Sequence, residues 1–355
     1  MYNIYPFRAI VPSTKCPYEY EIKNNFLHLK QDIVKNNFKR DCGIKHILSM
    51  MQKNYLVQQK KKGFYCCNIT APGISTTGLL ALIKVSNIGK IIFEHERCVD
   101  YKRDQYIQYF KKHTLQTSPI ILVHKDMEQI NLALNNIISK QEKFFSITAQ
   151  EYKYDLWQLK DILEYQKLYN KVFKFLIADG HHRIASLSKI DTNADVLVFL
   201  VSESNIKSAN ILREYVNTSD EIKSRLLSSL SENFSIKRLN CVETINVSDK
   251  IYIKIDDTIY IVEGSEMFLL KVQVLELLNN EINYVNRKLN FYNMDYESSK
   301  DKLIKNTKEI VVFIPAHVLR DDTKYSTFPP HSTLFYPKLP EGLISFLHGL
   351  ILKIR

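Results

Sequence analysis

The stretch KVFKFLIADGHHRIASLSKI, residues 171–190, joins an apolar run to a helical pattern through Asp-Gly and three basic side chains. Residues 172–178 predict a buried strand, and residues 181–190 predict a helix that begins directly after it. The start of a helix presents unpaired backbone N–H groups and partial positive charge. A glycine at this point permits a tight turn and the close approach of a ligand. The stretch therefore predicts an anion site at the helix start, with phosphate as the ligand that fits best.

Five consecutive residues form this predicted phosphate loop: Asp179, Gly180, His181, His182 and Arg183. The planar guanidinium of Arg183 is suited to bind two phosphate oxygens at once. The alternative is that Asp179 caps the helix and that the basic residues are ordinary surface, although basic groups in a first helical turn oppose the helix dipole. The P-loop signature is absent. Adjacent histidines on a helix point about 100° apart, which argues against a shared zinc ion.

The composition predicts a globular chain with two lobes. It has 355 residues, of which 45% are hydrophobic and 11% aromatic. The net charge of +11 favours anionic partners such as nucleotides, phosphorylated metabolites, nucleic acid or a membrane surface. A/T-rich coding, with its excess of Lys, Asn, Ile and Tyr, would give the same charge without any such partner.

The cysteines and the two ends of the chain predict a cytoplasmic protein without a membrane segment. Six scattered cysteines form no dense framework, which indicates reduced thiols. The first residues carry no signal sequence. The apolar residues 342–355 are too few to span a membrane, for which about 20 are needed, and they predict a final core helix.

Strands and helices alternate without a regular βαβ repeat, which predicts an α+β fold. Strands are expected at 64–69, 79–85, 118–126, 172–178, 194–201 and 309–315, a hairpin at 250–264, and helices at 101–113, 127–138, 154–169, 181–190 and 268–278. The character of the sequence changes near residue 204. We therefore predict a core domain at 1–204 that carries the phosphate loop, an α+β lobe at 205–308, and a C-terminal segment at 309–355 that packs back on the core.

Two further groups of polar residues are candidates for chemistry. His95 and Glu96 end an expected strand at residues 90–96, and a carboxylate beside a histidine is suited to take a proton from a hydroxyl. The alternative is a polar strand end that faces solvent. Asp104 follows on the next expected helix, where it would hold a metal ion, orient a base or simply face solvent. The proline-flanked stretch PPHSTLFYPK, residues 329–338, predicts a stiff polar loop that either binds a ligand or lies at the surface.

Five blocks of the sequence resemble, in the same order, those of the bacterial and archaeal family known as domain of unknown function 1015. They are IYPFRAIVPS, IIFEHERCVDYKRDQ, SPIILVHKD, IADGHHRIASL and PPHSTLFYPKLPEGL. The DGHHR block in turn resembles the phosphate loop of the ParB/sulfiredoxin-like fold. Free-serine kinases on that fold use such a loop for nucleotide phosphates and a glutamate as base. The resemblance implies a mixed sheet with a ParB/sulfiredoxin-like catalytic core and a smaller α+β lobe.

The resemblance also implies a function, that of a phosphotransferase acting on a small hydroxyl metabolite, with free serine the best candidate. ATP or ADP with Mg²⁺ would be the cofactor. Glu96 would be the base, assisted by His95 or His182. The implied cofactor-binding residues are Asp179, Gly180, His181, His182, Arg183, Arg8, Ser332, Thr333 and Lys338, and the implied metal ligands are Asp104 and Asp179.

Three positions depart from the family pattern, and each loses an expected cation. Gln105 and His331 stand where the family has arginine and lysine, and Tyr215 lies in the region that matches its His-Arg pair. A catalytically degenerate member is therefore one alternative. The other is a ParB-like protein that binds nucleotide and nucleic acid, although no helix-turn-helix or aromatic RNA-binding block is present.

Overall fold

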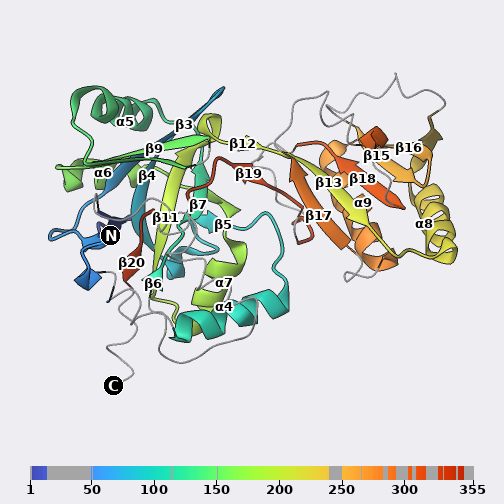
Figure 1. Ribbon diagram of the computed structural model, residues 1–355, viewed down its shortest axis with the longest axis horizontal. Helices are drawn as coiled ribbons and strands as arrows, with labels where there is room; N and C mark the ends of the chain where they lie inside the picture. The colour runs from blue at the N-terminus through green and yellow to red at the C-terminus, as the bar shows by residue number, and fades with distance from the viewer. Residues whose placement is uncertain are drawn as a thin grey trace. The chain divides into compact units, whose positions relative to one another are not determined.

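The computed structural model divides the chain into two compact units, which we describe separately (Figure 1). Unit 1 comprises Met1–Glu94, Cys98–Ile206 and Pro337–Arg355, and unit 2 comprises His95–Arg97 and Lys207–Tyr336. The structure describes residues 2–13, 49, 51–112, 115–149, 151–239, 250–264, 266–282, 287–292, 303–305, 309–316, 327–330, 332–340 and 343–347.

A mixed sheet forms the centre of unit 1. Its strands are β3 (Tyr65–Ala71), β4 (Ile74–Lys84), β5 (Ile92–Phe93), β7 (Ile120–His124), β8 (Phe145–Ala149), β9 (Tyr152–Gln158), β10 (Phe175–Asp179) and β11 (Asp195–Ser202). Their order in the sheet is β5-β10-β7-β11-β4-β3-β9-β8. The pairs β10–β5 and β11–β7 are parallel, and the other pairs are antiparallel. Seven of the eight residues of β11 are buried, as expected for a strand covered on both faces.

The described residues of unit 1 also form helices and short strands. The helices are α4 (Asp100–Lys112), α5 (Glu128–Lys140), α6 (Ile162–Tyr169) and α7 (His181–Ile190), and the short 3₁₀ segments are η1 (Val85–Asn87) and η2 (Glu203–Asn205). Two small sheets pair β1 (Ile10–Pro12) with β2 (Leu56–Gln58), and β6 (Leu115–Gln116) with β20 (Phe346–Leu347). All four helices supply side chains to one hydrophobic core with the sheet. α4 and α7 run side by side (Figure 1), and the buried Ser186 hydroxyl of α7 donates to the Arg103 carbonyl of α4 at 2.8 Å.

Unit 2 is built on an antiparallel sheet with its own core. Its strands are β13 (Asn210–Tyr215), β14 (Ser235–Arg238), β15 (Ile251–Ile255), β16 (Thr258–Glu263), β17 (Arg287–Tyr292) and β18 (Ile310–Ile314), in the order β14-β16-β15-β18-β13-β17. The helices are α8 (Asp220–Asn233) and α9 (Met267–Glu281), and a small sheet pairs β12 (Lys207–Ser208) with β19 (Phe335–Tyr336). Leucines of α8 and α9 pack on the inner face of this sheet.

The predicted α+β class with a large mixed sheet is confirmed, as are the strand and helix that flank Asp179 and Gly180. The helix predicted at 154–169 is wrong, because its first part is β9, which pairs with both β3 and β8. Only the second part is helical, and α6 begins after Asp161, whose side chain accepts the Glu164 N–H at 3.1 Å.

The predicted helix at 342–355 is also wrong where it can be compared, since Phe346 and Leu347 pair with β6 as a strand. Residues 348–355 of that helix lie outside the described residues. The domain boundary was predicted at residue 204, and in the structure the chain leaves unit 1 after Ile206. The predicted C-terminal segment 309–355 is divided, since its residues up to Tyr336 belong to unit 2 and those from Pro337 onward belong to unit 1.

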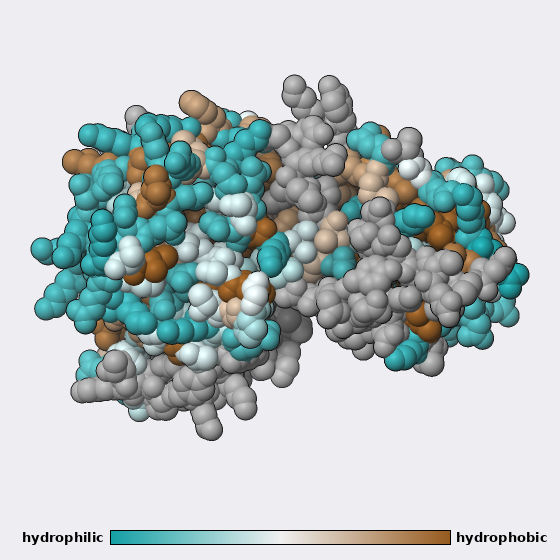
Figure 2. All heavy atoms as spheres, turned by 90° about the horizontal axis from the view of Figure 1, so that it is seen from above, coloured by the Kyte–Doolittle hydropathy of each residue, from teal (hydrophilic) through white to brown (hydrophobic). Residues whose placement is uncertain are grey.

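The face of the molecule that Figure 2 shows is mainly polar where its residues are described. On the face shown in Figure 2, hydrophobic residues appear as scattered spots among hydrophilic ones, as on ordinary protein surfaces. In the described parts of the chain, no helix has both the length and the apolar character needed to cross a membrane. The described cysteines Cys66, Cys67 and Cys98 are free thiols, of which the first two are buried.

Candidate functional site

The turn between β10 and α7 requires a glycine. Gly180 is the N-cap residue of α7 and adopts a left-handed conformation, with φ of 100° and ψ of 21°. A Cβ atom there would lie 2.9 Å from Cγ1 of Ile120 and 3.0 Å from Nη2 of Arg183. No side chain caps the helix. The amides of Arg183 and Ile184 bond to the Gly180 carbonyl. The chain therefore enters α7 through a bare backbone turn, and Asp179 does not act as the cap.

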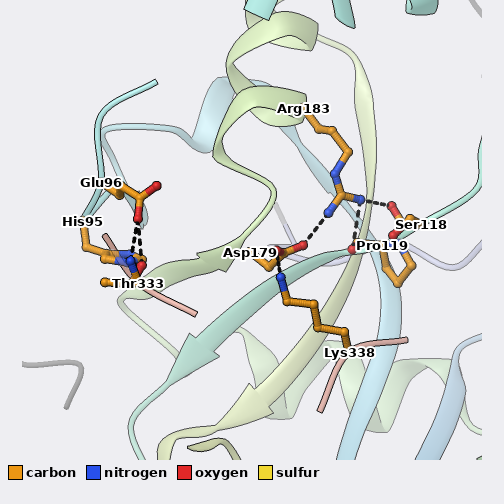
Figure 3. A network of polar contacts seen from close by, with 8 residues as sticks. All are labelled: His95, Glu96, Ser118, Pro119, Asp179, Arg183, Thr333 and Lys338. Atoms are coloured by element: carbon orange, nitrogen blue, oxygen red, sulfur yellow. Dashed lines mark hydrogen bonds and ion pairs between the residues drawn. The ribbon is translucent and has the colours of Figure 1, made fainter. Parts of the chain in front are cut away.

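Asp179 lies between two cations instead (Figure 3). Its Oδ1 accepts from Nζ of Lys338 at 2.5 Å, and its Oδ2 accepts from Nη2 of Arg183 at 2.7 Å. Burial alone would raise the pKa of the Asp179 carboxyl, but the charges of Lys338 and Arg183 outweigh it and lower the pKa to about 2. The carboxylate is thus ionised at neutral pH and holds both cations beside the start of α7.

Arg183 is anchored by the protein itself. Its Nη1 donates to the carbonyl oxygens of Ser118 and Pro119, the latter at 3.2 Å, in addition to the ion pair of Nη2 with Asp179. The side chain is only 14% exposed. These contacts fix its charge near the phosphate loop, but they direct its fork toward protein oxygens and not toward a ligand.

His182 acts as a neutral hydrogen-bond acceptor. Its Nε2 accepts the Val99 N–H at 2.9 Å. Burial, together with the nearby charges of Lys102 and Arg183, lowers the pKa of His182 to about 4 against the opposing effect of Asp179. At neutral pH the ring therefore carries no charge, and it joins the start of α7 to the segment that leads into α4. His181, next to it, is buried.

His95 and Glu96 belong to unit 2, where they contact the residues after Pro330. Oε2 of Glu96 accepts from the amides of Ser332 and Thr333, both at 3.1 Å, and from the Thr333 hydroxyl at 2.8 Å. Nε2 of His95 lies 2.8 Å from the same hydroxyl (Figure 3). His95 and Glu96 are 1% and 6% exposed. The structure thus brings four predicted site residues together in one buried polar network.

The other predicted residues lie elsewhere. Arg8 is exposed in unit 1, and among the described residues no backbone hydrogen bond joins it to the phosphate loop. Asp104 has a 64% exposed side chain, 3.6 Å from Nη2 of Arg103. Gln105 is half-buried in α4, and His331 lies outside the described residues.

The residues predicted to hold a metal ion do not form a metal site. The described parts of the chain contain no cluster of three or more His, Cys, Asp or Glu side chains suited to one ion. Asp104 faces solvent, and both oxygens of Asp179 are paired with cations. A protein-held Mg²⁺ does not fit these residues.

Sequence reasoning missed the buried cations of unit 2, among them Arg213 and Lys271. Arg213 on β13 is fully buried and donates to Oγ of Ser332 at 3.4 Å and to Oδ1 of Asn279 at 3.3 Å. Lys271 on α9 is 4% exposed and donates to the Ala316 carbonyl at 2.9 Å. The available signal was a charged residue inside an apolar strand or helix, which indicates a buried polar partner.

A narrow hollow lies beside this network. Ser332, Thr333 and Lys271 are among the residues that line it, but it is too tight to admit a water molecule. The network is therefore packed into the protein and does not open into a ligand cavity through this hollow.

Comparisons with known proteins give remote structural neighbours. A conserved hypothetical protein from Pyrococcus furiosus is 15% identical, with 74% of this chain and 93% of that chain covered and a TM-score of 0.43. A free serine kinase in complex with AMP is 15% identical, with 74% and 92% covered and a TM-score of 0.44. SbnI with a C-terminal truncation, from Staphylococcus aureus, is 12% identical, with 74% and 85% covered and a TM-score of 0.45. No curated protein matches the chain.

The family comparison is more extensive. A model described as protein of unknown function (DUF1015) matches residues 18–292, which is well over half of the 355 residues. The matched range includes Glu96 and the whole loop from Asp179 to Arg183. The chain therefore belongs to the DUF1015 family of proteins of unknown function.

Proposed function

We propose that this protein is a nucleotide-dependent phosphotransferase whose phosphate-binding element is the start of α7. The observation that carries the proposal is the charge around Gly180. The charge of Lys102 acts on His182, and those of Arg183 and Lys338 act on Asp179, so three cations lie around this turn. The helix dipole adds positive charge at the same place. Cations and a helix start of this kind, beside a glycine turn without a side-chain cap, favour phosphate oxygens.

The three cations would have different tasks. The side chain of Lys338 is 42% exposed, so its ammonium can reach an incoming phosphate while remaining near Asp179. Arg183 is held by carbonyl oxygens and would supply fixed charge behind the turn. Preorganised charge of this kind needs no rearrangement when the anion arrives, which is the main requirement of phosphoryl transfer.

In the proposed reaction a terminal phosphoryl group of ATP or ADP moves to the hydroxyl oxygen of a small metabolite, with free serine as the first candidate. A new P–O bond forms between the acceptor oxygen and the transferred phosphorus. The bond from that phosphorus to the bridging oxygen of the nucleotide breaks, and the nucleotide leaves with one phosphate fewer. The acceptor hydroxyl loses its proton to the carboxylate of Glu96. No magnesium ion held by the protein takes part in this proposed reaction. His182 takes no part in it either, because its role is to accept the Val99 N–H.

The first experiment measures nucleotide binding by titration calorimetry, with ADP and ATP, each with and without Mg²⁺. Lys338→Gln should weaken nucleotide binding about tenfold, because it removes one charge-assisted hydrogen bond to phosphate. Lys84→Gln is the matched control, since Lys84 also forms a short pair with an aspartate of the same unit, Asp195 at 2.7 Å, and is similarly exposed. No binding of either nucleotide, or equal effects of the two variants, contradicts the proposal.

The second experiment follows phosphate transfer to serine by phosphorus NMR. Glu96→Gln should abolish most of the transfer while leaving nucleotide affinity within about twofold, because the amide cannot take up a proton. Transfer that is unchanged by this substitution would remove Glu96 from the reaction. Nucleotide binding without transfer to any small hydroxyl compound would instead favour the degenerate alternative.

A further inference from the structure

The turn at Ser332 and Thr333 supplies three hydrogen-bond donors to one oxygen of Glu96. Two are backbone amides and one is a hydroxyl, at 3.1, 3.1 and 2.8 Å from Oε2. An ionised carboxylate oxygen accepts such a set, whereas a protonated carboxyl oxygen must itself donate. The arrangement therefore keeps Oε2 without a proton and fixes the rotation of the carboxyl group.

The direction of the next hydrogen bond follows from the chemistry of Thr333. A hydroxyl has a single proton, and here that proton goes to Glu96. Toward His95 the same oxygen is consequently an acceptor. Nε2 of His95, 2.8 Å away, must then carry a proton and donate it. The chain of hydrogen bonds thus runs from His95 through Thr333 to Glu96 (Figure 3).

Packing around the network makes these bonds strong. The ring of His95 meets those of Phe335 and Phe328 edge-on, with centroids 5.5 and 6.4 Å away. Residues 95–97 are also held through the backbone, since Phe328 donates to the His95 carbonyl at 2.8 Å and accepts from the Arg97 amide at 2.8 Å. Hydrogen bonds to a charged group gain strength in such a water-poor environment.

We propose that Thr333 is a positioning residue for the base of the reaction, not a ligand of the nucleotide. The inference rests on the proposed role of Glu96. Thr333 holds the carboxyl group of Glu96 in one orientation through its contact with Oε2, and it holds His95 as the tautomer protonated at Nε2.

The kinetic test compares Thr333→Val with Thr333→Ser. Valine keeps the shape and the backbone N–H but removes the hydroxyl, so kcat for phosphate transfer should fall about tenfold or more with KM for the nucleotide unchanged. Serine keeps the hydroxyl and should restore kcat to within about threefold. A rise of KM for the nucleotide at constant kcat would instead make Thr333 a cofactor ligand and overturn the inference.

A second measurement needs no activity, and so separates this inference from the proposed function. Nitrogen-15 NMR of the wild-type histidine side chains, assigned with a His95→Gln variant, reports which ring nitrogen carries the proton. The expected result at neutral pH is a protonated Nε2 on His95, with a changed ring signal in Thr333→Val and a nearly native one in Thr333→Ser. An unprotonated Nε2 in the wild type would mean that Thr333 donates to His95 and not to Glu96, which overturns the inference whether or not the protein transfers phosphate.

Discussion

At the scale of single residues, the start of α7 shows an apparent conflict between its sequence and the helix dipole. Two histidines and an arginine in the first turn should be unfavourable there. The structure reduces the conflict, because His182 is neutral and Arg183 is paired with Asp179. A basic residue in the sequence is thus not always a positive charge in the structure. The positive character of the site depends on Lys102, Arg183 and Lys338.

The neutral state of His182 predicts a specific pH dependence of stability. Its pKa is lowered from 6.5 to about 4 in the folded chain. The neutral form is therefore favoured by folding, and the resulting stability is complete above pH 6.5 and lost as the pH falls through about 4. We expect the loss to amount to about 1–2 kcal/mol after allowance for solvent screening. Urea unfolding at several values between pH 7 and pH 4 measures it.

The matched variant for this measurement is His182→Gln, which keeps an acceptor near the Val99 amide but does not titrate in this range. Its stability should fall less steeply than that of the wild type between pH 6.5 and pH 4, while other titrating groups affect both proteins equally. Identical slopes in the two proteins would show that His182 is not held neutral by the fold.

At the scale of elements, the pairing of β4 with β11 depends on a residue without a side chain. Gly78 lies opposite Val201, and a Cβ atom there would lie 2.5 Å from the Phe199 ring and 2.6 Å from the Leu200 carbonyl. Gly78→Ala should therefore force these central strands apart and lower the free energy of unfolding by about 3 kcal/mol or more. Denaturant unfolding of the full chain measures the loss.

Gly63→Ala is the control for this prediction, because its Cβ would meet only the flexible end of Gln158, at 3.0 Å. That side chain can move, so the loss should stay below about 1 kcal/mol. Equal losses in the two variants would mean that the sheet adapts at Gly78 and that close packing of β4 and β11 is not required there.

The elements that the sequence predicted well are those with a strong local signal. The strand β10 and the helix α7 follow from an apolar run, a glycine and a helical period. The helix predicted at 154–169 was wrong because the first part of this stretch, in β9, pairs with strands on both sides. Local periodicity does not reveal such pairing. β13 was not predicted for a similar reason, since its buried Arg213 and Glu214 break the apolar pattern of a strand.

At the scale of the whole molecule, the candidate site residues were predicted from motifs, but their partners were not. Lys338 pairs with Asp179 across 159 residues, and Thr333 bonds to Glu96 across 237. No local pattern specifies which distant donor reaches which carboxylate, because that depends on how the sheets are ordered. The family resemblance implied that Ser332 and Thr333 bind the nucleotide. In the structure their backbone N–H groups donate to Glu96.

The division into two units, each with a separate hydrophobic core, leads to a prediction about the complete chain. Leu187 of α7 is buried in the core of unit 1, and Leu275 of α9 is buried in the core of unit 2. Replacing either leucine with alanine leaves a cavity that costs about 2–5 kcal/mol. Because each cavity weakens only the packing of its own core, the loss should appear first as local opening of that unit.

Hydrogen exchange of the full chain, followed by mass spectrometry, measures where this opening occurs. Leu275→Ala should raise exchange most in β13, β15 and β18, which share its core, while the strands around β7 and β11 remain protected. Leu187→Ala should give the reverse pattern, because its neighbours belong to the sheet of unit 1. If both variants instead raised exchange equally in both sheets, the two cores would unfold as one cooperative structure, and the phosphate loop could not be altered without also disturbing the network around Glu96.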